Sequence, residues 1–227
     1  MTDNAGMRRK PMTSIFVHET TLGLTGDYET GVAIDAGSGS GALTESLQGR
    51  GFPMVMLDRD EDFTRSKPEG VDFILVDLNH GVPLRDCCVD YLFAIEVIEH
   101  LWNPYGFIRE VNRTLRGGGM FMMSTPNVEN IWQRLVYMLT GRYLYFKTQY
   151  VNVEGDHFSP IFENSLRVFC RQFYEFVSVT YNACFIPYIG KLQFLKPLTQ
   201  LKPLKNHKML GEIAIYQFKK IPETSRR

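Results

Sequence analysis

The chain has no excess of charge of either sign, because lysine plus arginine and aspartate plus glutamate number 25 each. Binding nucleic acid through its phosphates needs a basic surplus, so we expect no nucleic-acid partner. The 4 cysteines form no CxxC pair, which argues against a zinc site and a disulfide framework and favours the reducing cytoplasm. No run of about 18 apolar residues occurs, and no apolar signal-peptide stretch follows the basic N-terminus. We therefore expect neither export nor a membrane span.

What the sequence does contain is an alternation of strand-like and helix-like segments, in a chain that is 44% hydrophobic. Short, nearly continuous apolar runs predict strands that end at Asp35, at Asp58 and at Pro126, and others within residues 71–79, 89–101, 175–183 and 211–220. Such runs are typical of a parallel sheet covered by helices on both faces. Asn103 and Pro104 predict the start of a helix, which we expect Gly117–Gly119 to end. The alternation predicts one doubly wound α/β domain.

The domain organisation follows from where this alternation begins and where it is interrupted. Residues 1–28 give weak signals and form an N-terminal segment, and residues 29–227 form the domain. Two insertions interrupt it, at about 128–155, rich in aromatic residues, and at 187–210, rich in lysine. Insertions after the strands of an α/β sheet usually determine substrate specificity. The aromatic insertion suits either a lid over the acceptor or a packed helical hairpin.

The stretch "AIDAGSGSGALTESL" places Gly37, Gly39 and Gly41 between a strand and a helix. Alternating glycines in such a turn indicate a ligand close to the main chain. Two ligand classes compete. A dinucleotide fingerprint is satisfied if Ala42 takes its last position and Asp58 contacts a ribose. However, Asp35 precedes the turn, and its carboxylate would repel a pyrophosphate but suits a ligand with an ammonium and a sulfonium group, such as S-adenosylmethionine.

The motif "IDAGSGSGALTESL" resembles the first motif of the class I S-adenosylmethionine-dependent methyltransferases. "EVIEHL" and "REVNRTLRGGG" resemble the following part of the branch that includes the ubiquinone O-methyltransferases and the methyltransferases of bacterial polysaccharide and sugar pathways. "GDHFSPIFENSLRVFC" resembles the Gly-x-His segment of that branch. The resemblance covers residues 30–127 and, more loosely, 155–181. It implies a seven-stranded, mostly parallel sheet whose last strand is antiparallel.

The resemblance also implies a set of cofactor-binding residues. In this sequence they are Asp35, Ala36, Gly37, Ser38, Gly39 and Gly41 for the methionine part, Asp58 with Arg59 beside it for the ribose, Asp77 and Leu78 for the adenine, and Ile95 and Glu96 for the cavity of methyl transfer. Two of these residue types have simpler explanations. Asp58 suits the N-terminal end of a helix, and Asp77 suits a turn.

Two histidines are candidates for the catalytic base, because a hydroxyl acceptor must lose a proton during methyl transfer. His157 follows Asp156 in a segment expected over the pocket, and His100 belongs to "EVIEHL". The alternatives are a loop histidine that bonds to the backbone and, for His100, an anchor after the fourth strand. We expect no metal, because the spacing of Asn79, Asp86 and Asp90 is not diagnostic of a metal site.

The function predicted is S-adenosylmethionine-dependent transfer of a methyl group to a small molecule, to an oxygen of a sugar or glycan intermediate or of another hydroxylated metabolite. Two alternatives stay open: a nicotinamide-dependent oxidoreductase and a non-catalytic S-adenosylmethionine-binding protein. In residues 187–210 leucines interleave with lysines, which suits peripheral contact with anionic lipid on the inner membrane face, or else a solvated loop.

Overall fold

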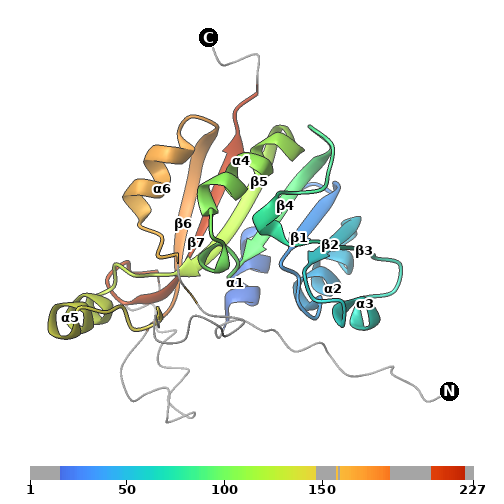
Figure 1. Ribbon diagram of the computed structural model, residues 1–227. Helices are drawn as coiled ribbons and strands as arrows, with labels where there is room; N and C mark the ends of the chain where they lie inside the picture. Colours follow the sequence, from blue (N-terminus) through green and yellow to red (C-terminus); the bar gives the residue numbers. More distant parts are fainter. Residues whose placement is uncertain (1–15, 147–156, 158, 185–205, 223–227) are drawn as a thin grey trace.

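A seven-stranded sheet runs through the computed structural model, which describes residues 16–146, 157, 159–184 and 206–222 (Figure 1). The strands lie in the order β3-β2-β1-β4-β5-β7-β6. Their bounds are β1 Ala33–Ala36, β2 Met54–Asp58, β3 Asp72–Leu75, β4 Val89–Ile95, β5 Leu115–Pro126, β6 Tyr174–Cys184 and β7 Gly211–Lys220. β1 to β5 pair in parallel, whereas β7 is antiparallel to both β5 and β6. The predicted α/β sheet with an antiparallel last strand is confirmed.

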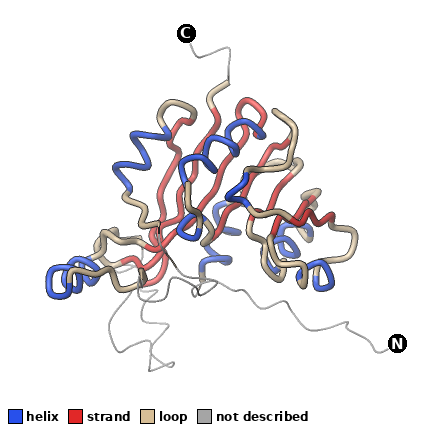
Figure 2. The backbone as a smooth tube through the Cα atoms, viewed as in Figure 1, coloured by secondary structure: helices blue, strands red, loops and turns tan. Residues whose placement is uncertain are grey.

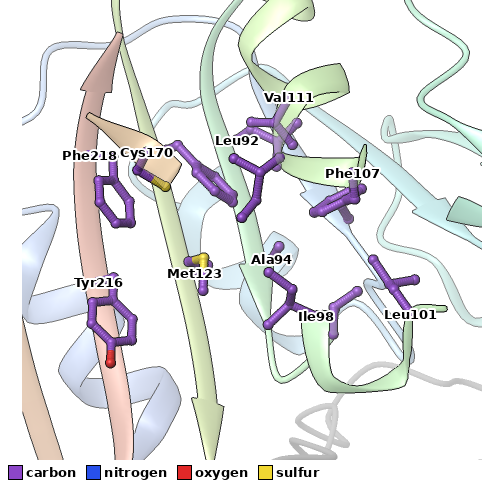
Figure 3. Close-up of a cluster of buried hydrophobic side chains, with 14 of the residues drawn as sticks. Leu92, Ala94, Ile98, Leu101, Phe107, Val111, Met123, Cys170, Tyr216 and Phe218 are labelled. Atoms are coloured by element: carbon purple, nitrogen blue, oxygen red, sulfur yellow. The ribbon is translucent and has the colours of Figure 1, made fainter. Parts of the chain in front are cut away.

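Helices alternate with the strands and cover both faces of the sheet (Figure 2). They are α1 Val17–Leu24, α2 Ala42–Gln48, α3 Phe63–Ser66, η1 Leu78–His80, η2 Ile98–His100, α4 Pro104–Thr114, α5 Ile131–Thr140 and α6 Glu163–Cys170. Successive residues of β4 therefore enter two different cores. Leu92 and Ala94 pack with α4 and α6 (Figure 3), whereas Phe93 and Ile95 pack with α1 and α2. Burial on both faces explains the continuous apolar runs of the sequence.

The helix before β5 ends earlier than predicted. α4 begins as expected, since Asn103 Oδ1 accepts from the Gly106 N–H at 2.8 Å, but it stops at Thr114, and Gly117–Gly119 belong to β5. The expectation that these glycines end the helix is wrong. They instead let β5 pass close to β4, because a Cβ on Gly119 would lie 2.9 Å from the Asp90 carbonyl oxygen. The β4–β5 register shifts at the same point, as glycine in a strand often indicates.

The described part of the N-terminal segment packs onto the sheet. Val17 of α1 is buried among the residues of the second core. The Tyr28 ring stacks on Tyr91 of β4 at 5.0 Å, and Gln217 of β7 donates to the Tyr28 hydroxyl. Contacts with β4 and β7 thus hold residues 16–28 against the domain.

Of the two predicted insertions, the first is partly described. Residues 131–140 form α5, which Figure 1 shows beyond the carboxyl end of β5 and apart from the helical layers. Residues 147–156 and nearly all of 187–210 lie outside the described residues. None of the described helices combines the length and apolar character needed to cross a membrane.

Candidate active site

A cavity of about 280 Å³ opens at the carboxyl ends of β1, β2 and β4, the edge at which doubly wound sheets bind ligands. The predicted site residues that line it are Asp35, Gly37, Ser38, Gly39, Asp58, Arg59, Asp77, Leu78, Ile95, Glu96 and His100. Three others do not line it. Ala36 packs in the first core, Gly41 is the N-cap of α2, and His157 is in ring contact with both Phe146 and His100.

The glycine turn after β1 requires glycine for a steric reason. Gly37, Gly39 and Gly41 all have positive φ, between 50° and 78°, a conformation that residues with a Cβ rarely adopt. A Cβ on Gly37 would also lie 2.4 Å from Val97 Cγ2. The turn therefore brings bare backbone against the loop after β4, at the wall of the cavity.

The backbone N–H groups of this turn distinguish the two ligand classes. Those of Gly37 and Ser38 donate to the Leu57 carbonyl oxygen, and that of Gly41 donates to the Ser38 carbonyl oxygen. The Gly39 N–H donates to Asp58 Oδ2 at 2.8 Å. A phosphate-binding turn instead points such groups at the phosphate. Because these four donors are used within the protein, the turn is poorly suited to a pyrophosphate.

The charge of the cavity leads to the same conclusion. Among the described residues its walls carry four carboxyl groups, from Asp35, Asp58, Asp77 and Glu96, with Arg59 as their one arginine or lysine. Such a lining repels a dinucleotide pyrophosphate and attracts a cation. In addition, the Ser38 hydroxyl is buried against the cavity and has no hydrogen-bond partner within the described part of the chain. The residues fit a cationic ligand with several polar groups, as S-adenosylmethionine is.

Asp35 is the most deeply buried of these acids, with 3% of its surface exposed. The Thr44 hydroxyl of α2 donates to its Oδ2 at 2.6 Å. Burial raises the pKa of Asp35 to about 6, and the nearby Asp58 carboxylate adds to this shift, while Thr44 opposes it. The carboxyl is thus poised to ionise fully when a cation enters the cavity.

Asp58 and Asp77 are set at the ends of β2 and of the segment that follows β3. Asp58 accepts from the Gly39 N–H through one oxygen and from the Asp60 N–H through the other. Each oxygen keeps a second lone pair for a ribose hydroxyl. Asp77 caps η1 by accepting from the Asn79 N–H at 2.9 Å, and this bond is the main reason that its pKa lies below the ordinary value. Asp77 is therefore a turn residue that also lines the cavity.

The end of β4 has a strained backbone. Glu96 has φ 55°, which is unusual for a residue that carries a side chain and is typical of functional sites. The Glu96 N–H donates to the Ser124 hydroxyl of β5 at 2.9 Å. That bond helps to hold the Glu96 residue in this conformation at the wall of the cavity.

The two predicted histidines are brought together by the fold. Their rings cross edge to face with centroids 4.6 Å apart, and His100 lines the cavity. The segment after His157 is tied to η2, because the Ser159 N–H donates to the Glu99 carbonyl oxygen and the Ser159 hydroxyl donates to that of Leu101. The Phe146 ring also contacts His157, with centroids 5.7 Å apart. His157 thus joins the aromatic insertion to the cavity.

Glu99 lies next to both histidines and is fully buried. Burial raises its pKa well above the ordinary value, and the Glu96 carboxylate reinforces the shift. Ligand atoms of Glu99, His100 and His157 lie within 4.8 Å of one another, a spacing that a metal ion could bridge. The acids weighed from the sequence are engaged elsewhere, because Asp86 pairs with Arg113 and Asp90 with Arg116. The expectation that the protein uses no metal stays a prediction, to be checked by activity in a chelator.

Sequence reasoning missed several residues of the cavity. They are His18, Leu43, Phe63, Val76, Val97 and Leu101. Most of them lie beside predicted residues and continue the same segments. His18 is different, because it comes from α1, a segment with weak signals, and burial lowers its pKa. Only the docking of α1 on the sheet brings His18 to the site.

Comparison with known proteins agrees with this geometry. Residues 34–123 match the family described as a methyltransferase domain. A probable S-adenosylmethionine-dependent methyltransferase of Mycobacterium tuberculosis is 36% identical over 97 residues, which are 41% of this chain and 35% of that protein. A ubiquinone biosynthesis O-methyltransferase of Glaesserella parasuis is 26% identical over 128 residues, which are 52% of each chain. The chain therefore aligns with only part of the length of these relatives.

The solved structures extend the likeness to the whole sheet. A methyltransferase of Archaeoglobus fulgidus, described as S-adenosylmethionine-dependent, superposes with a TM-score of 0.62 at 13% identity, over 89% of this chain and 94% of that one. At this identity the likeness concerns the fold alone. Residues 34–123 therefore resemble a methyltransferase domain, the sheet has the fold of this methyltransferase structure, and the acidic cavity has residues that fit S-adenosylmethionine.

Proposed function

We propose that this protein transfers the methyl group of S-adenosylmethionine to an oxygen of a small molecule, namely a sugar or glycan intermediate or another hydroxylated metabolite. The observation that carries the oxygen acceptor is the contact of His157 with His100 beside the cavity, since a hydroxyl needs a base. The relative from Glaesserella parasuis is named an O-methyltransferase, which supports the same choice of atom.

Different residues of the cavity would bind different parts of S-adenosylmethionine. When bound, S-adenosylmethionine supplies a methyl group activated by a sulfonium. Asp35 would offset positive charge, Asp58 would accept from the ribose hydroxyls, and Asp77 with Leu78 would meet the adenine. Apolar side chains of Ile95 and Val97 line the same cavity and exclude water, so that methyl transfer depends mainly on alignment of the acceptor.

In this proposal the two histidines remove the proton from the acceptor hydroxyl. His157 would take the hydroxyl proton of the acceptor, and the His100 ring, in edge contact with it, would hold it in position. A histidine has an ordinary pKa near 6.5, so the rate should rise with pH as the ring loses its proton.

The first experiment is calorimetric titration of the purified protein with S-adenosylmethionine, S-adenosylhomocysteine, NAD and NADP, in the wild type and in Asp58→Ala. We expect binding of the first two ligands only, and its loss in the variant. Tighter binding of a dinucleotide would overturn the assignment of the cavity. A subsequent screen of sugars and hydroxylated metabolites as acceptors would identify the substrate, and no turnover of any acceptor with intact cofactor binding would favour a non-catalytic protein.

The base is tested once an acceptor is found. His157→Ala should lower kcat by about 10²-fold or more, the usual contribution of a general base, and should remove the rise of the rate with pH. His157→Gln separates chemistry from packing, because glutamine keeps a polar side chain that cannot take the proton. A pH profile of either variant equal to that of the wild type would exclude His157 as the base.

A further inference from the structure

Helix α5 presents its apolar side chains to solvent and buries a polar one. Met138 is 72% exposed and Leu139 is 78% exposed, and Leu135 and Tyr137 are also exposed. By contrast, Gln133 of the same helix is fully buried. Leu135, Met138 and Leu139 have the i, i+3, i+4 spacing of one helix face. An apolar face turned outward over adjacent positions indicates a surface that binds something.

The orientation of α5 is fixed by contacts on its inner side. Asn130 is buried and caps the helix, with its Oδ1 accepting from the Gln133 N–H and its Nδ2 donating to the Asn127 carbonyl oxygen. Gln133 Oε1 accepts from the Leu144 N–H at 2.8 Å. The Ile131 N–H donates to the Met209 carbonyl oxygen. Since these contacts hold the polar side inward, the apolar face is a built feature of the fold.

Within residues 131–146 the charged side chains are of one sign. Arg134 and Arg142 are both exposed, and residues 131–146 contain no aspartate or glutamate. An apolar helix face flanked by arginines suits the boundary between acyl chains and anionic headgroups. We propose that α5 docks the protein on an anionic lipid bilayer, with Met138 and Leu139 inserted among the lipids.

A protein partner fits this face less well. A stable protein interface uses about 20–30 residues on each side, whereas the exposed apolar face comprises three side chains, Leu135, Met138 and Leu139, of a ten-residue helix. Insertion of a few side chains beside basic residues is sufficient for reversible binding to a membrane. α5 follows β5 at the carboxyl edge of the sheet, the edge of the cavity (Figure 1). Docking would therefore bring the membrane to the side of the molecule on which the acceptor enters.

The test is sedimentation of the full chain with vesicles of phosphatidylcholine alone or mixed with phosphatidylglycerol. We expect binding to the mixed vesicles at low salt, weaker binding to the neutral ones, and release as salt rises. Met138→Asp with Leu139→Asp should lower the partition coefficient at least about tenfold, because two large apolar side chains no longer enter the bilayer. Arg142→Glu should lower it about fivefold on anionic vesicles only.

Matched controls keep the result interpretable. Val168 of α6 and Val177 of β6 are 49% and 48% exposed, so Val168→Asp with Val177→Asp changes the same number of exposed apolar residues elsewhere and should leave vesicle binding unchanged. Thermal melting checks that each variant is folded, and Met138→Ala with Leu139→Ala provides a milder change. S-adenosylhomocysteine binding, measured separately, tests the cofactor site and does not depend on this docking.

Three results would overturn the docking proposal. The wild type could fail to sediment with anionic vesicles at low salt. The Met138→Asp, Leu139→Asp variant could bind as the wild type does. Finally, the wild type could be a dimer in analytical ultracentrifugation that this variant dissociates, in which case α5 meets a second copy of the chain.

Discussion

At the scale of single residues, the buried Asp35 carboxyl links stability to ligand binding. Its pKa of about 6 lies above the ordinary value, so the folded, unliganded protein keeps a proton that the unfolded chain releases near pH 4. Stability without ligand should therefore fall as the pH rises from about 4 to about 6, by up to about 3 kcal/mol. Asp35→Asn should remove this dependence, which thermal melting across pH would reveal.

Ionisation of Asp35 has the opposite effect on cofactor binding. A cationic ligand favours the ionised carboxyl, so the affinity for S-adenosylmethionine should rise as the pH increases through about 6 and then level off. Calorimetry between pH 5 and pH 8 checks this outcome. Asp35→Asn should bind the cofactor more weakly and without that rise, whereas an unchanged profile would show that Asp35 does not sense the ligand.

Gly37 tests the steric requirement of the turn. Gly37→Ala would place a methyl group 2.4 Å from Val97 Cγ2 at a positive φ, and should cost about 1–3 kcal/mol of stability along with cofactor affinity. Gly23 is the control, because nothing lies within 4 Å of its added Cβ. Gly23→Ala in α1 should stabilise the protein by about 0.5–1 kcal/mol. Combining Gly37→Ala with Val97→Ala should recover part of the loss, as chemical denaturation would measure.

At the scale of elements, the N-cap residues of α4 and α5 should differ in how much stability is lost when each is replaced. Asn103 is an exposed cap with one bond to the Gly106 N–H, so Asn103→Ala should cost about 1 kcal/mol. Asn130 is fully buried, and it also binds the Asn127 and Gly211 carbonyl oxygens. Asn130→Ala should therefore cost about 2–3 kcal/mol, because buried groups lose their partners. Equal denaturation midpoints for the two variants would contradict this difference.

The elements also differ in how far the sequence predicts them. The strands were predictable because continuous apolar runs are required when both faces are buried, and the ends of β2, β5 and β7 agree with the prediction. The end of α4 was not predictable from the sequence. Gly117–Gly119 let β4 and β5 approach each other closely, and local propensity does not encode such a contact between strands.

At the scale of the whole molecule, cofactor binding should stabilise the fold. The cavity is formed by segments that follow β1, β2, β3 and β4 together with α1, so it is absent from the unfolded chain. A ligand at 100 times its Kd adds about 2.7 kcal/mol to the free energy of unfolding. We expect S-adenosylhomocysteine to raise the Tm of the wild type and not that of Asp58→Ala. An equal rise in the variant would place the ligand outside this cavity.

The sequence by itself determined the class of sheet and the acidic glycine turn, because both leave a local pattern in the chain. Strands buried on both faces are continuous apolar runs, positive φ favours glycine, and the residues at the end of each strand follow it directly in the sequence. Asp35, Gly37 and Asp58 were therefore found from their order along the chain, and they line the cavity. Only the tertiary structure decided that His18 reaches the cavity, that His100 meets His157, and that α5 turns its apolar face outward. Each of these depends on packing between segments far apart in the sequence, which hydrophobic periodicity leaves open.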